Sequence, residues 1–66
     1  MTIYQVKIKE SLVDITYNYC RKNNLTGYEA RPFVSNLLES ITPESRPTVT
    51  AICMATDRRI WSLQSL

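Results

Sequence analysis

The first residues of the chain alternate between apolar and polar side chains. In the segment 3–9, Tyr4, Val6 and Ile8 fall on one side of an extended chain, and the side chains between them are polar. Alternation with a period of two residues is typical of a half-buried β-strand. A lone strand leaves backbone groups unpaired, so we expect this one to pair with the C-terminal region or with the same strand of a second copy.

Helical periodicity follows in the segment 11–23, where the apolar side chains fill one continuous arc of a helix and the polar side chains fill the rest. Arg21 and Lys22 come in the last turn, where positive charge opposes the helix dipole. We expect Asn23 and Asn24 to end the helix, because Asn tolerates the left-handed backbone conformation. The apolar arc is wide for so short a chain, which indicates that a second copy covers part of it.

A second helix is predicted within residues 27–41, because apolar side chains recur there at helical spacing. Thr26 and Glu29 have the spacing of a capping box, which would begin the helix directly after Thr26. Pro32 is unfavourable beyond the first turn of such a helix. We therefore favour a start near Pro32, with residues 26–31 forming a structured turn before it.

The C-terminal part of the chain is predicted to form a β-hairpin. A connector with two prolines precedes a run rich in β-branched residues, 48–55, and four polar residues separate this run from residues 60–63, three of which are apolar. Two such runs around a short polar segment are typical of a hairpin. A helix is the alternative, which we disfavour because Thr50, Thr56 and Asp57 would interrupt its apolar face.

Together these elements predict one small α+β domain over residues 1–66, with a strand and two helices in 1–41 and a hairpin extension in 48–66. The chain is 44% apolar and 21% charged, a composition typical of globular proteins. A chain of this length gains a larger core by sharing one, so we expect an intertwined homodimer. The formal charge of +2 permits a nucleic-acid partner without requiring one.

The composition argues against catalysis. The chain has no His, so imidazole acid–base chemistry and His metal ligands are absent. Its two cysteines, Cys20 and Cys53, are too few for a four-ligand zinc site, and its one glycine cannot form a glycine-rich phosphate loop. We therefore expect no enzyme, no metal and no cofactor. With no secretory signal and no membrane span, we expect a cytoplasmic chain with reduced, buried thiols.

The C-terminal segment offers a candidate surface for a protein partner. Trp and Arg are enriched among the residues that dominate the binding energy of interfaces, and this segment holds Arg58, Arg59 and Trp61 beside apolar residues. The alternative is that Trp61 caps the core of its own chain. As a binding surface, the segment predicts a non-catalytic module or inhibitor that docks on a larger protein.

The predicted strand offers a second candidate surface. Its polar side carries Gln5, Lys7 and Lys9, which either stay in solvent or enter a DNA major groove, where Lys and Gln reach base edges. Residues 4–41 resemble the ribbon-helix-helix repressors, the group of Arc, MetJ and CopG, in element order, element length and apolar spacing. Residues 19–26 look like the helix-to-turn junction of that family.

This resemblance implies a small DNA-binding transcriptional regulator. In the family, two chains pair their strands into a β-ribbon that reads the bases of duplex DNA, and the start of the second helix holds a phosphate. The DNA-binding residues implied here are Gln5, Lys7 and Lys9 on the ribbon and Thr26, Gly27 and Tyr28 near the phosphate. A repressor of this kind is our first functional expectation, and the protein-binding module is the alternative.

Overall fold

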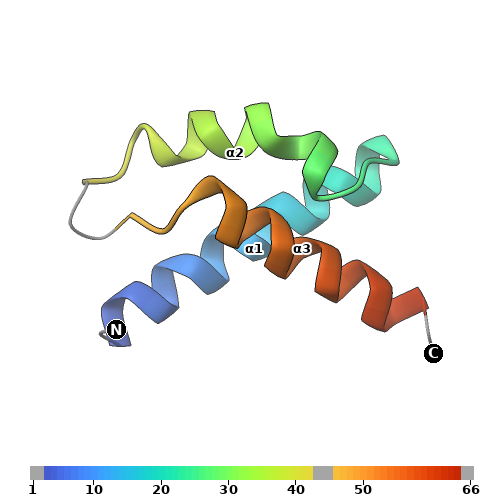
Figure 1. Cartoon of the computed structure of the whole chain (residues 1–66), viewed down its shortest axis with the longest axis horizontal. Helices are drawn as coiled ribbons and strands as arrows, with labels where there is room; N and C mark the ends of the chain where they lie inside the picture. The colour runs from blue at the N-terminus through green and yellow to red at the C-terminus, as the bar shows by residue number, and fades with distance from the viewer. Residues whose placement is uncertain (1–2, 43–45, 65–66) are drawn as a thin grey trace.

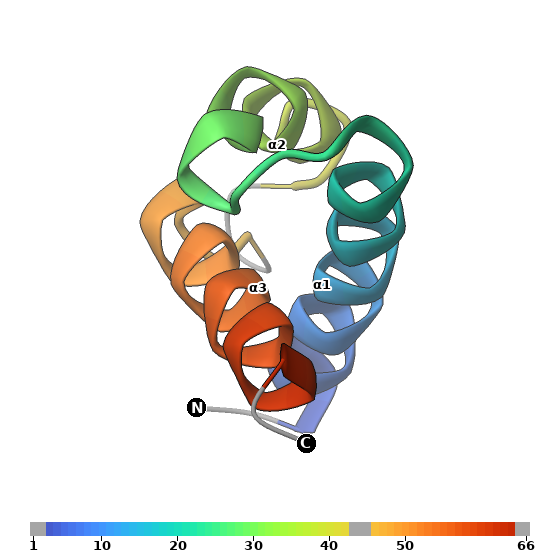
Figure 2. The ribbon, with the colours of Figure 1, turned by 90° about the vertical axis from the view of Figure 1, so that its right-hand side faces the viewer.

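The described residues fold into three α-helices and one short 3-10 helix. The computed structural model describes residues 3–42 and 46–64, which hold α1 (Ile3–Asn23), the short 3-10 helix η1 (Tyr28–Ala30), α2 (Arg31–Leu38) and α3 (Val49–Gln64). Helices α1 and α3 run in the same general direction and cross, while α2 runs back above them (Figure 1). Seen from the side, the three helices surround a common core (Figure 2).

The predicted α+β fold is wrong, because the described residues contain no strand. Residues 3–9, predicted as a strand, are the first turns of α1 and run without a break into the helix predicted over 11–23. In a helix each backbone group finds its partner four residues away, whereas a strand needs a second strand beside it. Ile8 lies one helical turn before Leu12, and it packs against the core that contains Leu12.

The predicted hairpin is also wrong, and the helix that we disfavoured is present as α3. Thr48 caps its first turn, because the Thr48 hydroxyl accepts the backbone N–H of Ala51 at 3.0 Å. Ile52 and Thr56, one turn apart, are both fully buried. A polar residue on the buried side of α3 is therefore accommodated in the core rather than ending the helix.

The end of α1 agrees with the sequence prediction. Asn24 has a φ of 55°, the left-handed conformation that ends helices. The N–H of Leu25 then bonds back to the carbonyl of Cys20 at 2.9 Å, which is the pattern of a Schellman motif. The chain is thereby turned from α1 toward η1.

The start of α2 combines the two possibilities that the sequence raised. The capping box forms, because the Thr26 hydroxyl accepts the Glu29 N–H at 3.1 Å and the Glu29 carboxylate accepts the Thr26 N–H at 2.9 Å. The chain then makes η1, and α2 begins only at Arg31. Pro32 consequently lies in the first turn of α2, where its missing N–H is not needed. The later start is confirmed.

The core is assembled from all three helices. Its buried cluster consists of Leu12 and Val13 from α1, Val34 and Leu38 from α2, and Ile52 and Cys53 from α3. The wide apolar arc of α1 is covered from two sides within one chain: α3 packs along it, and Tyr19 stacks on Phe33 of α2 with 3.9 Å between ring centroids. Ile15 of α1 stays 46% exposed, and the homodimer stays a prediction.

Two threonines lie in the core with unsatisfied hydroxyl groups. Thr16 of α1 and Thr56 of α3 are fully buried, and neither Oγ1 has a hydrogen-bond partner in the described part of the chain. We expect Thr16→Val and Thr56→Val each to raise the free energy of unfolding by about 1 kcal/mol, because valine keeps the shape and removes an unpaired polar atom. Urea denaturation measures this change.

The control for these variants is Thr50→Val, since Thr50 is an exposed residue of α3. Its effect should stay within about 0.5 kcal/mol. A loss of stability in Thr16→Val or Thr56→Val would contradict the prediction, because it would mean that the hydroxyl is paired in solution.

Candidate functional site

The outward face of α3 carries large exposed side chains. Met54, Arg58 and Trp61 are spaced four and three residues apart, so they lie on one side of the helix. The exposed fraction is 51% for Met54 and 69% for Trp61. Trp61 therefore does not cap the core, which was the alternative to a binding role.

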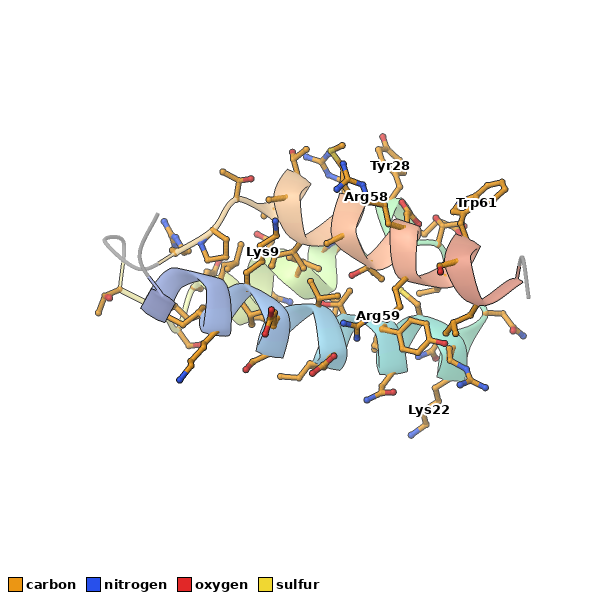
Figure 3. All side chains as sticks on the ribbon, turned by 90° about the horizontal axis from the view of Figure 1, so that it is seen from below. Lys9, Lys22, Tyr28, Arg58, Arg59 and Trp61 are labelled. Carbon is orange, nitrogen blue, oxygen red and sulfur yellow. The ribbon has the colours of Figure 1, made fainter. Side chains whose placement is uncertain are left out.

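Tyr28 and Arg31 extend this surface from η1 and the start of α2. Tyr28 is 69% exposed, and the Arg31 guanidinium lies 5.6 Å from the centroid of its ring. Figure 3 shows Tyr28, Arg58 and Trp61 projecting at the same edge of the molecule, with Lys22 at the opposite edge. We call the surface formed by Tyr28, Arg31, Met54, Arg58 and Trp61 the outer patch.

Arg59, predicted with Arg58 and Trp61 as a binding residue, contacts another helix of its own chain. It forms an ion pair with Asp14 of α1, and its guanidinium lies 5.6 Å from the centroid of the Tyr17 ring. Figure 3 places Arg59 between α1 and α3, away from the outer patch. Arg59 thus joins two helices, whereas Arg58 is turned toward solvent.

A groove lies beside the outer patch, where α1 and α3 end. Its volume is about 520 Å³, and it is lined by Cys20, Arg21, the loop 24–26, Asp57, Ile60 and Trp61. We call it the end groove. Trp61 belongs to both the groove and the patch, so the two surfaces adjoin at this residue.

The predicted phosphate site is occupied by the protein's own groups. The Gly27 N–H donates to Asp57 Oδ1 at 2.6 Å, and the Thr26 N–H donates to the Glu29 carboxylate. Two carboxylates thus lie where a phosphate was expected, and like charge disfavours a further anion. Of the three residues predicted there, Thr26 and Gly27 bind these carboxylates, while the Tyr28 ring belongs to the outer patch.

Gly27 is required by space rather than by backbone conformation. Its φ of −58° suits any residue. A Cβ at this position, however, would lie closer to the Cys53 carbonyl oxygen than real Cβ atoms come, and 3.0 Å from Cγ and Oδ1 of Asp57. The only glycine of the chain therefore lets the backbone before η1 lie directly on α3.

The three residues predicted to read DNA bases lie on α1. Lys7 is exposed and Lys9 is half-buried, so they do not share one solvent face. Gln5 belongs to the first turns of α1, and its side chain lies outside the described residues. The β-ribbon that would present these side chains to a major groove requires a strand, and residues 3–9 form a helix instead.

Both thiols are expected to react slowly with iodoacetamide. Cys20 and Cys53 are buried and free. Burial raises the pKa of both thiols, and the negative charges of Asp57 and Glu29 raise the pKa of Cys20 further. Because the thiolate is the reactive form, alkylation near pH 8 should be at least about tenfold slower in the native protein than in urea. Mass spectrometry measures both rates, and native labelling at the unfolded rate would contradict this prediction.

The structure also reveals contributors that the sequence analysis missed. Asp57 was assigned to the polar segment between the two predicted strands of the hairpin, and Arg31 to a turn. The signal for Asp57 was its position four residues before Trp61, which places both side chains on one side of a helix. That signal could be used only once α3 was known to be a helix.

Some classes of site are absent from the part of the chain that the structure describes. No three Cys, Asp or Glu side chains gather there to hold a metal ion. Among the described helices, none combines the length and the apolar character needed to cross a membrane. Comparison with family models, with curated proteins and with solved structures gives no match. The function is therefore inferred from the outer patch and the end groove.

Proposed function

We propose that this chain is a non-catalytic protein-binding module that docks on a larger protein through the outer patch. The observation that carries the proposal is the exposure of Tyr28, Met54 and Trp61 around the guanidinium groups of Arg31 and Arg58. Tyr, Trp and Arg are the residues that most often dominate the binding energy of a protein interface. A helix face of this kind fits a groove on a partner.

The charges of the outer patch define the chemistry of the partner. Among the described residues, Arg31 and Arg58 make no ion pair. The ion pair found there joins Arg59 to Asp14. The nearby carboxylates of Glu29 and Asp57 accept backbone N–H groups of the turn before α2. A complementary partner therefore presents carboxylates opposite Arg31 and Arg58 and an apolar pocket for Met54 and Trp61.

A nucleic-acid partner is less well supported. Residues 3–9, which would form the ribbon, are helical, and the backbone amides expected to hold a phosphate bind carboxylates instead. DNA binding is therefore an outcome that the experiment must detect rather than the proposal itself.

Photo-crosslinking tests the proposal. A photoreactive benzoylphenylalanine replaces Met54 in the full chain, and in a control protein it replaces Asn36, an exposed residue of α2. We expect one discrete protein adduct from position 54 and none from position 36. The captured protein is then purified, and its affinity for the unmodified chain is measured.

Two matched charge reversals show whether the outer patch is the interface. Arg58→Glu should weaken the purified complex by at least about tenfold, because it places like charges together. Lys22→Glu makes the same change in net charge at the opposite edge (Figure 3) and should leave the affinity unchanged. Equal weakening by both variants would contradict the proposal. So would tight binding to duplex DNA that falls steeply as salt is raised from about 50 to 200 mM.

A further inference from the structure

We propose that the end groove binds the guanidinium group of an arginine side chain, held between the Asp57 carboxylate and the Trp61 indole ring. The inference rests on the proposed function in taking the arginine from the partner protein. The site shares Trp61 with the outer patch but differs from it in charge, because Arg31 and Arg58 attract carboxylates and Asp57 attracts a cation.

Asp57 gives the groove its negative charge. It lines the groove and is half-buried. Its Oδ1 accepts the Gly27 N–H at 2.6 Å, which fixes the orientation of the carboxylate. In the described part of the chain Asp57 makes no ion pair. A fixed and partly desolvated carboxylate without a cation is a strong acceptor for a guanidinium N–H group.

Trp61 and the apolar lining supply the second half of the site. Trp61 follows Asp57 by one helical turn, so the indole and the carboxylate lie on the same side of α3. A guanidinium is planar and stacks on an aromatic ring, and indole is the most favourable ring for a cation. Half-buried Leu25 and Ile60 line the same groove and offer apolar surface to the methylene groups of an arginine.

Arg21 and Arg59, which lie near the groove, are engaged with the Tyr17 ring. Arg21 lines the groove, but its guanidinium lies 5.7 Å from the centroid of the Tyr17 ring. Arg59 is paired with Asp14 and lies over the same ring. The last turn of α3 also has no basic side chain to oppose the negative end of its dipole. Burial raises the pKa of the neighbouring Cys20 thiol, and the negative charges of Asp57 and Glu29 raise it further.

NMR titration of the full chain tests this site with a defined probe, the capped peptide acetyl-Gly-Arg-Gly-amide. Two resonances report on the two halves of the site: the Gly27 amide, which bonds to Asp57, and the indole N–H of Trp61. Each is the only residue of its type in the chain, so both signals are readily assigned. We expect both to shift and saturate, with a dissociation constant of about 1–10 mM, as for a single side chain in an open site.

Two control peptides separate the effect of the positive charge on binding from the effect of the planar shape of the guanidinium group. Replacing arginine by citrulline keeps the planar group and removes the charge, and it should abolish saturable binding. Replacing arginine by lysine keeps the charge as a compact ammonium, and it should weaken binding at least about threefold, because the planar stack on Trp61 is lost. Binding of the citrulline peptide as tight as that of the arginine peptide would overturn the proposal. Equal binding of the lysine peptide would overturn the assignment to arginine.

Variants of the chain locate the site. Asp57→Asn keeps an oxygen that can accept the Gly27 N–H, and it should weaken binding of the arginine peptide about tenfold. Glu39→Gln removes the same charge from an exposed residue after α2 and should have no effect. Trp61→Leu should weaken binding of the arginine peptide about fivefold, because the indole ring is lost. This variant tests the site even if Asp57→Asn fails to fold. Equal effects of Asp57→Asn and Glu39→Gln on the affinity for the arginine peptide would overturn the proposal that the peptide binds at Asp57.

Failure of this site and failure of the proposed function are distinguishable. If the arginine peptide does not bind while position 54 still crosslinks to a partner, the groove proposal is wrong and the docking proposal stands. If the peptide binds as described and crosslinking fails, the groove is an arginine site and the docking proposal is wrong.

Discussion

Gly27→Ala is expected to lower the free energy of unfolding by about 3 kcal/mol, which corresponds to a fall in melting temperature of about 12–24 °C for a domain of this size. The added methyl group would occupy space already filled by the Cys53 carbonyl oxygen and would press on the Asp57 carboxylate. Relief requires η1 to move away from α3. That movement would break the hydrogen bond from the Gly27 N–H to Asp57.

The direction of the change in stability distinguishes the two possibilities for Gly27→Ala. Gly27 has helical backbone angles, and alanine at a helical glycine normally stabilises a protein by about 1 kcal/mol. A gain in stability for Gly27→Ala would therefore mean that the close approach to α3 does not exist in solution. Thermal unfolding followed by circular dichroism measures the change.

Ile52→Ala is expected to cost about 3–4 kcal/mol, because it opens a cavity where the three helices meet. Ile52 has no exposed surface, and its buried cluster includes residues of α1, α2 and α3. In so small a domain this loss is a large share of the total stability, so the variant should be partly unfolded at room temperature. Urea denaturation gives the free energy.

Met54→Ala is the matched control for Ile52→Ala. It removes a side chain of similar volume from the same helix two residues later, where half of the residue is exposed. Its effect on stability should stay below about 0.5 kcal/mol. Met54→Ala should instead weaken binding to the partner. Similar destabilisation by both variants would mean that the faces of α3 are assigned incorrectly.

The sequence predicted the helix over 11–23 with its Asn end, the capping box and the late start of α2, because each is decided by local chemistry. Asn24 adopts the left-handed conformation, and Thr26 and Glu29 bond across three residues. These features depend on neighbours along the chain. Tertiary contacts reinforce them without creating them.

The predicted strand and hairpin failed where local and tertiary preferences compete. Alternation over Tyr4, Val6 and Ile8 also fits a helix, in which Ile8 lies one turn before Leu12 and packs against the core. In the C-terminal segment, β-branched Val49, Thr50 and Ile52 favour a strand by propensity. Packing on α1 and α2 overrides that weak preference, as it often does for short segments.

Only part of the candidate site could be predicted from the sequence. Trp61 and Arg58 were identified by residue type, and both lie on the outer patch. Arg59 was indistinguishable from Arg58 by type, and only the position of Asp14 on the neighbouring helix separates their roles. The contact between Gly27 and Asp57 joins residues 30 positions apart, so no local pattern could reveal it.

The turn between α1 and α2 also has a consequence for the order of folding. The Leu25–Cys20 bond and the capping box close over six residues or fewer, so this turn forms without α3. The link from Asp57 to Gly27 closes a much longer loop, which costs more chain entropy. We therefore expect α1 and α2 to pair before the folding barrier is crossed and α3 to dock after it. Loss of the Asp57 carboxylate then accelerates unfolding and leaves the folding rate nearly unchanged.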